Sequence, residues 1–237
     1  MGDATAGQME TTLMEVVETT NEAFSNSEIP LHFSLVHAAK IQYQSTESSS
    51  ASLTRLSSSS EIANLRDTYA ADLVQIFHDY GDECGNGFTN TELLPELGYS
   101  VVNPTCIDTL ASTHEFGHAF GCSHNREDSE VDTKYSHGHR VCTSTDRNTR
   151  FRSVMSYDCD GVPVINYFSN PDVLYDGQPT GTATEDNART IKENMEAVAK
   201  FRWPKITAKA TRDVQWEPTS LPPVVIDKPA LPANASV

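Results

Sequence analysis

Basic residues, long apolar runs and closely spaced cysteine pairs are scarce or absent in this sequence, and each absence excludes a class of protein. Lysine and arginine number 17 against 33 aspartates and glutamates, which gives a formal net charge of −16. Such an acidic surface repels nucleic acid and anionic lipid, so we expect neither as a partner. No apolar run approaches the roughly 20 residues that span a bilayer, so we expect no membrane contact.

None of the five cysteines forms a CxxC pair, which argues against a zinc site built from cysteine alone. In a reducing compartment they would be thiols or metal ligands, and in a secreted protein they would give two disulfides and one thiol. We favour two disulfides and therefore a secreted protein. The opening residues MGDATAGQMETTLMEVV lack the pattern of a signal peptide, so we expect either a fragment of a longer protein or an incomplete gene model.

Apolar periodicity predicts alternating helices and strands in the first third of the chain. Residues 8–25 have helical spacing, residues 31–43 are rich in β-forming residues, and the Ser/Thr-rich residues 45–60 are typical of a solvated loop. A short helix at 60–66 and a buried strand at 71–77 follow. This order favours an α/β sheet with crossover helices.

The remaining elements are shorter, apart from one amphipathic helix near the end of the domain. We expect strands at 87–89 and 99–102, a helix at 107–120, an irregular region at 125–162 and the amphipathic helix at 187–202. From Pro204 onward the chain is rich in proline. We therefore predict one domain over residues 1–203 and a Pro-rich linker or tail over residues 204–237.

Three of the eight histidines lie within the stretch THEFGHAFGCSHN that begins at Thr113. Residues four apart share one face of a helix, with about 5–6 Å between their Cβ atoms, so His114 and His118 can bind one ion. Gly121 can take the left-handed conformation that ends a helix, and the resulting turn would bring His124 to the same ion. Three neutral nitrogens with one open position are typical of a catalytic zinc site.

Glu115 follows the first of these histidines directly and is poorly placed to be a further ligand. It can reach a water on the metal, whose pKa zinc lowers toward neutrality. Glu115 is therefore the expected general base, which passes the proton on to a leaving amine. A single His-Glu pair on a helix is usually a solvated face, and the five fixed positions of HExxHxxGxxH are what favour the metal site.

The stretch HEFGHAFGCSH resembles the signature of the metzincin zinc peptidases, which is followed by a Met-turn. The resemblance implies that Met155, in the sequence SVMSY, packs beneath the site without binding the metal. Tyr157 matches the tyrosine that astacin-like and serralysin-like metzincins bring to the zinc, as a loose ligand or as a hydrogen-bond donor to the oxyanion. The alternative for Tyr157 is a buried tyrosine with a satisfied hydroxyl.

Softer matches over roughly residues 10–202 resemble the reprolysin-like and peptidyl-Asp metallopeptidases, which usually have aspartate where this chain has Asn125. The resemblance implies an α/β fold with a twisted, mostly parallel sheet over two long helices, and a small irregular C-terminal subdomain. The family begins with a strand before its first helix, so the first strand is expected to be missing here. The softer matches are ADLV at 71–74, CG at 84–85, YSHGH at 135–139, FRSVMSY at 151–157, YFSNP at 167–171 and DNAR at 186–189.

Within such a fold we expect the disulfides Cys142–Cys159 and Cys84–Cys106, with Cys122 left over. His137 and His139 form an HxH pair, which in a polar loop is more often exposed or hydrogen-bonded than metal-binding. Structural Ca²⁺ is compatible with the many loop carboxylates, but no calcium-loop pattern is present. The expected cofactor is therefore one catalytic Zn²⁺.

These observations predict a secreted zinc metalloendopeptidase that acts on protein or peptide substrates, with zinc on His114, His118 and His124. Nothing in the sequence indicates an oligomeric state. The main alternative is a catalytically silent, metzincin-shaped binding or adhesion module, against which the intact Glu115 argues because a binding module needs no general base. A second alternative is a metal-dependent hydrolase of a non-peptide bond.

Overall fold

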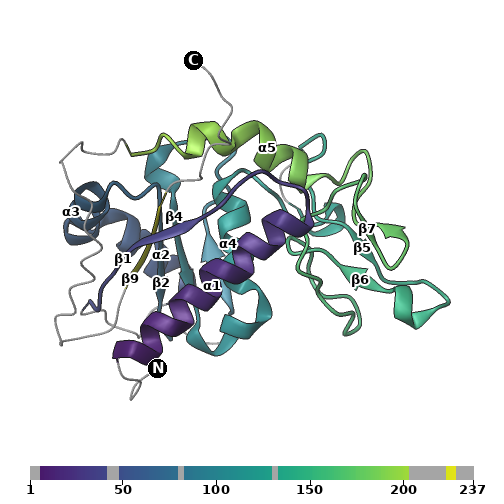
Figure 1. Cartoon of the computed structure of the whole chain (residues 1–237), viewed down its shortest axis with the longest axis horizontal. Helices are drawn as coiled ribbons and strands as arrows, with labels where there is room; N and C mark the ends of the chain where they lie inside the picture. The colour runs from purple at the N-terminus through teal and green to yellow at the C-terminus, as the bar shows by residue number, and fades with distance from the viewer. Residues whose placement is uncertain (1–5, 42–47, 80–82, 130–132, 203–222, 228–237) are drawn as a thin grey trace.

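The computed structural model describes residues 6–41, 48–79, 83–129, 133–202 and 223–227 (Figure 1). Five strands form the main sheet, in the order β1-β9-β2-β4-β3. Their bounds are β1 (Ser34–Ala38), β2 (Leu73–Phe77), β3 (Gly85–Gly87), β4 (Tyr99–Val102) and β9 (Pro223–Asp227). The helices are α1 (Ala6–Asn26), α2 (Ser49–Ser58), α3 (Ser60–Tyr69), α4 (Ala111–Ala119) and α5 (Asn187–Val198), with short 3₁₀ turns at Pro95–Leu97, Pro104–Thr109, Arg126–Asp128 and Arg147–Thr149.

The sheet is less parallel than expected. β1, β2 and β4 run in one direction, but only β2 and β4 pair in parallel, because β9 lies antiparallel between β1 and β2 and β3 pairs antiparallel with β4. The mostly parallel sheet predicted from the family resemblance is thus corrected to one parallel pairing among the four that link these strands.

Strand β9 comes from the segment that was predicted to be a Pro-rich linker or tail. Its sequence PVVID contains three consecutive β-branched residues, which favour a strand. Pro223 is the first residue of the strand, a position that proline tolerates. The proline content of the segment therefore concealed a strand of the sheet. The rest of the predicted tail lies outside the described residues, and the division into a domain and a tail stays a prediction.

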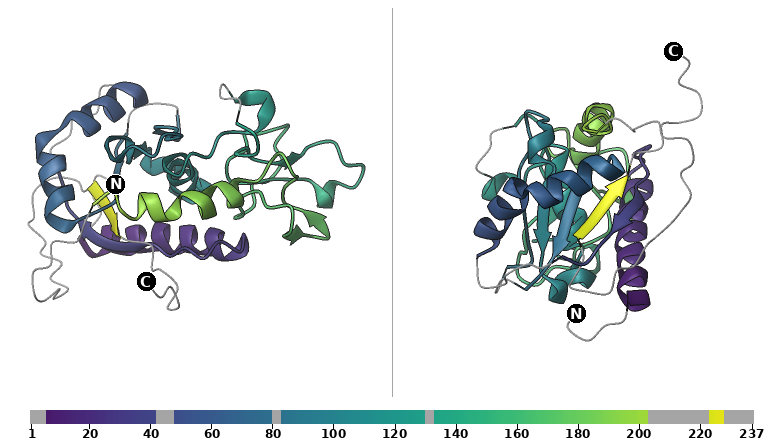
Figure 2. Two further views of the ribbon diagram at one scale, coloured as in Figure 1. Left: turned by 90° about the horizontal axis from the view of Figure 1, so that it is seen from above. Right: turned by 90° about the vertical axis from the view of Figure 1, so that its left-hand side faces the viewer.

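Helices cover both faces of the sheet, with α1 on one side and α2 and α3 on the other (Figure 2). Alternate residues of β2 explain the two layers, because successive side chains of a strand point to opposite faces. Leu73 and Phe77 pack into a core shared with α1, α4 and α5. Val74 and Ile76 pack into a second core shared with α2 and α3. The motif helix α4 thus lies on the α1 side of the sheet.

Helix α2 overturns the prediction of a solvated loop over residues 45–60. The Ser48 hydroxyl accepts a hydrogen bond from the amide of Ala51 at 3.3 Å and caps the helix. Leu53 and Leu56 are buried against the sheet. The serine-rich composition concealed a helix that is stabilised by its cap and by two leucines, since tertiary burial overrides weak helix propensity.

Other predictions are confirmed with changed bounds. The helix over 8–25, the strand over 71–77 and the helix over 187–202 correspond to α1, β2 and α5. The expected helix over 107–120 is interrupted at Leu110, whose φ of 64° separates a 3₁₀ turn from α4. The predicted strand over 31–43 is shorter, since β1 spans Ser34–Ala38. The described residues before β1 hold a helix and no strand.

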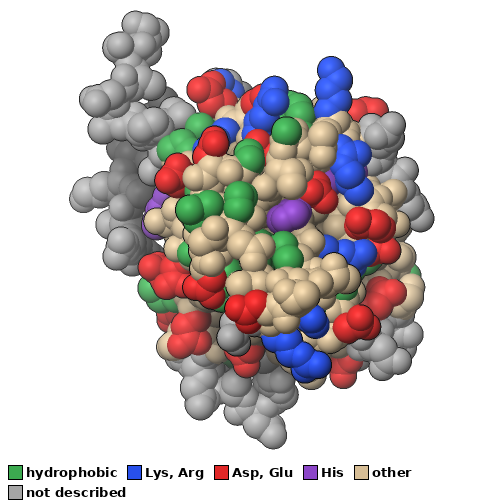
Figure 3. All heavy atoms as spheres, turned by 90° about the vertical axis from the view of Figure 1, so that its right-hand side faces the viewer, with side chains coloured by type: hydrophobic (Ala, Val, Ile, Leu, Met, Phe, Trp, Pro, Cys, Tyr) green, Lys and Arg blue, Asp and Glu red, His purple; other side chains and the backbone are tan. Residues whose placement is uncertain are grey.

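The chain between α4 and α5, here called the irregular region, contains two small hairpins. It lies at the end of the molecule away from α2 and α3 (Figure 1). Its strands are β5 (Arg140–Val141), β6 (Phe151–Arg152), β7 (Leu174–Tyr175) and β8 (Gln178–Pro179). Acidic and basic side chains are interspersed over this end (Figure 3). Both predicted disulfides, Cys84–Cys106 and Cys142–Cys159, are present, and Cys122 is free and buried. Within the described part of the chain, no helix is long and apolar enough to cross a membrane.

Candidate metal centre

Helix α4 and the turn after it bring the three histidines of the motif together. His114 and His118 lie one helical turn apart, with ring centroids 4.8 Å from each other. The helix ends at a turn in which the amide of Gly121 donates to the carbonyl of His118 at 2.9 Å. Gly121 has a φ of 85°, a conformation that glycine adopts without steric cost. The chain then reverses, and His124 returns to the other two rings.

The Nε2 atoms of the three rings converge on one point. His124 Nε2 lies 3.1 Å from His118 Nε2 and 3.2 Å from His114 Nε2. A tetrahedral zinc with Zn–N bonds of about 2.0–2.1 Å places its nitrogens ~3.3 Å apart. Among the described residues these three form the one group of histidine, cysteine or acidic side chains close enough to hold an ion. All three nitrogens lie within 4.8 Å of one another, so the two distances to His124 and the chemistry of the set fit zinc.

Two backbone carbonyls fix the protonation of the rings. His114 Nδ1 donates to the carbonyl of Val154 at 2.8 Å, and His118 Nδ1 donates to the carbonyl of Cys122 at 2.8 Å. A carbonyl can only accept, so Nδ1 carries the proton and Nε2 of the neutral ring presents a lone pair. At most one of these two lone pairs could accept a proton from His124. The remaining lone pair is available to bind a cation, as in metal sites whose ligands are held by a hydrogen bond at the other ring nitrogen.

Burial keeps the rings neutral. It lowers the pKa of His114 to about 4, with a further contribution from the neighbouring His124. Burial also holds the pKa of His118 well below its ordinary value, with contributions from His114 and His124. Both rings are therefore neutral at pH 7, which is the state that binds metal.

Glu115 lies on the same helix, and its side chain is buried with only 5% of the residue exposed. Its Oε2 atom is buried and has no hydrogen-bond partner within the described part of the chain. In the metal-free chain, burial raises the pKa of Glu115 to about 8, with a smaller contribution from the charge of Glu83. An unpaired buried carboxylate is costly, and a bound cation nearby would lower its pKa again.

Met155 lies beneath the helix, in a turn where the amide of Ser156 donates to the carbonyl of Ser153 at 3.0 Å. Its side chain is fully buried. A Cβ atom on Gly117 would lie 2.3 Å from Met155 Sδ, so the methionine packs where the helix has no side chain. Sequence analysis missed Gly117, although a glycine in the middle of a helix is an available signal of close packing.

Tyr157 is 46% exposed, so the alternative of a buried tyrosine does not hold. Its ring centroid lies 4.1 Å from that of His124. The amide of Tyr157 donates to Asn125 Oδ1 at 2.9 Å. Asn125 Nδ2 in turn donates to Glu127 Oε2 and to Asp128 Oδ2, each at 2.8 Å. Asn125 thereby joins the third histidine to the residues after the Met-turn, a role that sequence analysis missed.

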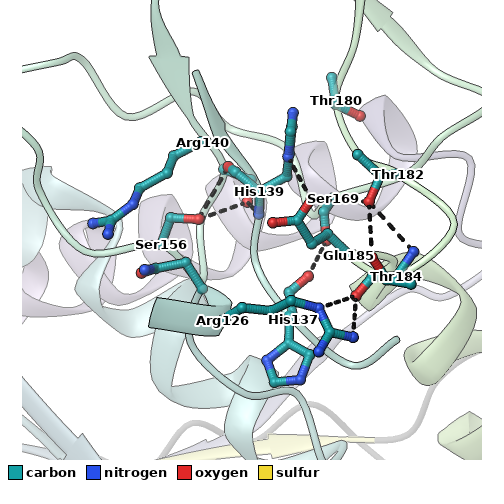
Figure 4. A network of polar contacts seen from close by, with 12 residues as sticks. Arg126, His137, His139, Arg140, Ser156, Ser169, Thr180, Thr182, Thr184 and Glu185 are labelled. Carbon is teal, nitrogen blue, oxygen red and sulfur yellow. Dashed lines mark hydrogen bonds and ion pairs between the residues drawn. The ribbon is translucent and has the colours of Figure 1, made fainter. Parts of the chain in front are cut away.

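His137 and His139 lie behind the centre and are not part of the three-histidine group. His137 lies between two carbonyl oxygens, with Nδ1 3.0 Å from that of His124 and Nε2 2.8 Å from that of Thr133. His139 Nδ1 pairs with Glu185 Oε2 at 3.0 Å. The Ser156 hydroxyl donates to the carbonyl of His139 at 3.0 Å. Figure 4 shows this network between the Met-turn and the segment before α5. The HxH pair is hydrogen-bonded, as expected, and supports the loop that carries His124.

Comparison with known proteins relates this site to metallopeptidases. Residues 11–125 match the family model of reprolysin-like metallopeptidases of family M12B. A peptidyl-Asp metalloendopeptidase of Stenotrophomonas maltophilia (strain R551-3) is 27% identical over 209 residues, covering 84% of this chain and 49% of the relative. One of Xanthomonas campestris pv. campestris is 28% identical over 211 residues, covering 84% and 48%. One of Pseudomonas fragi is 30% identical over 104 residues, covering 41% and 65%.

A chain in a solved chaperone–substrate complex shares the fold. It superposes with a TM-score of 0.65 at 21% identity, over 84% of this chain and 33% of the other. The chain spans about half the length of the first curated relatives that it matches. The resemblance to reprolysin-like and peptidyl-Asp metallopeptidases, inferred from the short matches on either side of the zinc motif, is confirmed.

Proposed function

We propose that this chain is the catalytic region of a secreted zinc metalloendopeptidase that cleaves peptide bonds in proteins. One observation carries the proposal: the Nε2 atom of His124 lies 3.1 Å from that of His118 and 3.2 Å from that of His114, and all three lie within 4.8 Å of one another. Two of the three rings have Nδ1 bound to a carbonyl. A closed structural zinc site would have a fourth protein ligand, and the described residues bring none to this group. The two disulfides support an oxidising, extracellular setting.

Zinc, when bound by His114, His118 and His124, supplies a Lewis acid that polarises water and a carbonyl oxygen. Glu115 then accepts the proton of the attacking water and delivers it to the leaving amine. Its burial supports this role, because a carboxylate with few competing partners is a stronger base. The phenol of Tyr157 stabilises the negative charge that develops on the carbonyl oxygen. Its exposed position beside His124 supports that assignment.

The names of the relatives lead us to propose a preference for aspartate beside the scissile bond. The chain offers two guanidinium groups next to the segment that follows the Met-turn. Arg152 Nη1 donates to the carbonyl of Ser156 at 3.0 Å, and Arg140 Nη1 donates to that of Tyr157 at 3.3 Å. The charge of Arg152 is near enough to contribute to the lowered pKa of His114. Arg140 already pairs with Glu127 and Asp128, and Arg152 pairs with Asp158. A carboxylate side chain of a substrate would therefore bind here by replacing one of these partners.

The test compares the unmutated chain with Glu115→Ala and with the matched control Glu18→Ala, which removes an exposed glutamate of α1. Bound zinc is measured by atomic absorption, and cleavage of a denatured protein is followed with and without a chelator. We expect about one zinc per chain in all three proteins. Cleavage should occur in the unmutated and control proteins, be abolished by the chelator and be lost in Glu115→Ala. Mass spectrometry of the fragments reports whether aspartate flanks the cleaved bonds.

Two outcomes would contradict the proposal. Full activity in a zinc-loaded Glu115→Ala protein would remove the general-base role. Zinc in every variant with no cleavage in any of them would favour the silent binding module, which shares the metal ligands but has no use for a general base.

A further inference from the structure

The edge strand β3 presents bare backbone to the carboxylate of Glu115. Gly85 and Gly87 are two residues apart, so they lie on the same face of the strand. A Cβ atom on Gly85 would lie 2.4 Å from Glu115 Oε1 and 2.9 Å from its Cδ and Cγ. A Cβ atom on Gly87 would lie 2.9 Å from Glu115 Oε2. Real Cβ atoms do not approach other atoms so closely, so the space that Glu115 fills exists because both side chains are absent.

Backbone conformation does not explain these two glycines. The glycines with positive φ in the described chain are Gly121, Gly161 and Gly177. Gly85 and Gly87 have backbone angles that alanine also adopts, so their requirement is for space alone. Glycine weakens a strand relative to alanine, and here two of the three residues of β3 are glycine. The two glycines thus weaken the strand, and they leave the space that the Glu115 side chain occupies.

The strand is held from several sides and is not free to retreat. It pairs antiparallel with β4, with Gly87 opposite Ser100. The disulfide Cys84–Cys106 fixes the residue just before the strand. On the opposite face, Asn86 Nδ2 donates to the hydroxyls of Ser49 at 3.0 Å and Ser50 at 3.2 Å in α2. An added side chain on the glycine face would therefore displace the end of the Glu115 side chain before it displaced the strand.

We propose that Gly85 and Gly87 are positioning residues for Glu115, holding its carboxylate between β3 and α4 by leaving that face of the strand empty. The inference rests on the proposed function only where it assigns Glu115 the role of general base. The contact itself is independent of activity. Gly87 is the better site for a test, because the other atoms nearest to its added Cβ are Ser100 Cβ at 3.4 Å and the Glu115 carbonyl oxygen at 3.5 Å, both ordinary contacts.

The first experiment measures thermal unfolding of the metal-free chain for Gly87→Ala, Glu115→Ala and the double variant. Gly87→Ala alone is expected to lower Tm, because the new methyl group collides with the carboxylate. In the Glu115→Ala background the same change should leave Tm unchanged or raise it, because the collision is gone and alanine suits a strand better. An equal loss of Tm in both backgrounds would overturn the proposal. If Gly87→Ala alone does not fold, folding of the double variant supports the proposal and failure of both overturns it.

The second experiment measures zinc content and peptide cleavage. Gly87→Ala should bind about one zinc per chain, lower kcat by about tenfold or more and change KM by less than about twofold, because misplacing a general base affects the chemical step. Asn86→Ala is the matched control on the opposite face of the strand. It should keep kcat and shift Tm equally with and without Glu115. Full kcat in Gly87→Ala would overturn the proposal. If the unmutated chain itself cleaves nothing, the proposed function fails, and the Tm comparison still decides the contact.

Discussion

We expect the stability of the protein to depend strongly on the side-chain amide of Asn125, in which a single atom can be changed. Its side chain is completely buried. Nδ2 donates to the carboxylates of Glu127 and Asp128, and Oδ1 accepts the amide proton of Tyr157. Asn125→Asp keeps the acceptor and replaces the donor by an oxygen, which leaves three carboxylates around one point. Aspartate is also the residue that reprolysin-like peptidases usually have after the third histidine, so the change tests whether this chain has adapted to asparagine.

The expected cost follows from the lost hydrogen bonds. A hydrogen bond to a charged group contributes about 1.5–3 kcal/mol, and two are lost. The side chains of Glu127 and Asp128 are 65% and 38% exposed and can turn toward solvent and Arg140. The lower end for two bonds is about 3 kcal/mol, and this relaxation reduces the expected cost to about 2–3 kcal/mol at pH 7. For a domain of this size that corresponds to a fall in Tm of about 5–10 °C.

The sign of the pH dependence gives a second test of Asn125→Asp. Burial and two neighbouring carboxylates raise the folded-state pKa of the new aspartate above its unfolded value. A group with a raised pKa favours folding below its unfolded pKa and loses that contribution as pH rises through its folded pKa. The deficit relative to the parent should therefore be smaller near pH 4 than at pH 7. In the parent, the hydrogen bond from Asn125 is the main cause of the lowered pKa of Glu127.

Thermal unfolding of the metal-free proteins at several pH values measures both effects. The second variant is Asn125→Asp with Glu127→Gln, in which the glutamine amide can donate to the new carboxylate and one negative charge is removed. It should recover part of the lost Tm. A single variant as stable as the parent at pH 7, or a double variant no better than the single one, would refute the reasoning.

Three further predictions concern the ligands and their support. His124→Ala should weaken zinc binding by about a hundredfold or more. Zinc at ~100 times the parent's Kd stabilises the parent by about 2.7 kcal/mol and should stabilise the variant by about 0.4 kcal/mol or less, with a correspondingly smaller rise in Tm. Isothermal titration and Tm check this, and unchanged affinity would exclude His124 as a ligand. Tyr157→Phe should lower kcat by about tenfold to a hundredfold with little change in KM, and steady-state kinetics with kcat intact would refute the oxyanion role. Gly117→Ala should cost about 1–3 kcal/mol by overpacking against Met155, and adding Met155→Ala should remove the overpacking; equal Tm for the parent and Gly117→Ala would contradict this.

Features encoded locally were predictable from the sequence. The helical spacing of α1 and α5 and the buried run of β2 each follow from a few neighbouring residues. The histidine spacing also predicts the three-histidine group, because a helical turn and one glycine turn suffice to bring three rings together. The two disulfide pairings are present as suggested, although cysteine spacing alone does not determine which cysteines pair.

Features that depend on distant partners were missed or misjudged. The serine-rich α2 is stabilised because Leu53 and Leu56 are buried in the second core, and the local sequence does not indicate this burial. Strand β9 depends on a gap between β1 and β2 far away in the sequence. The need for glycine in β3 opposite Glu115 follows from the packing of the strand against α4, which the sequence alone does not give. In each case the structure or role of a segment depends on residues that contact it only in the folded chain.

The metal centre depends on the irregular region as much as on its own helix. The bond from His118 to the Cys122 carbonyl is made within the motif, but other contacts that orient the histidines come from outside it. His114 is oriented by the Val154 carbonyl beside the Met-turn, and the carbonyl of His124 is held by His137. If the irregular region detached from α4, His114 would lose the acceptor that fixes its tautomer, and its Nε2 would present a lone pair only part of the time. Zinc affinity should therefore report the docking of this region on α4, since metal binding and assembly of the site are linked.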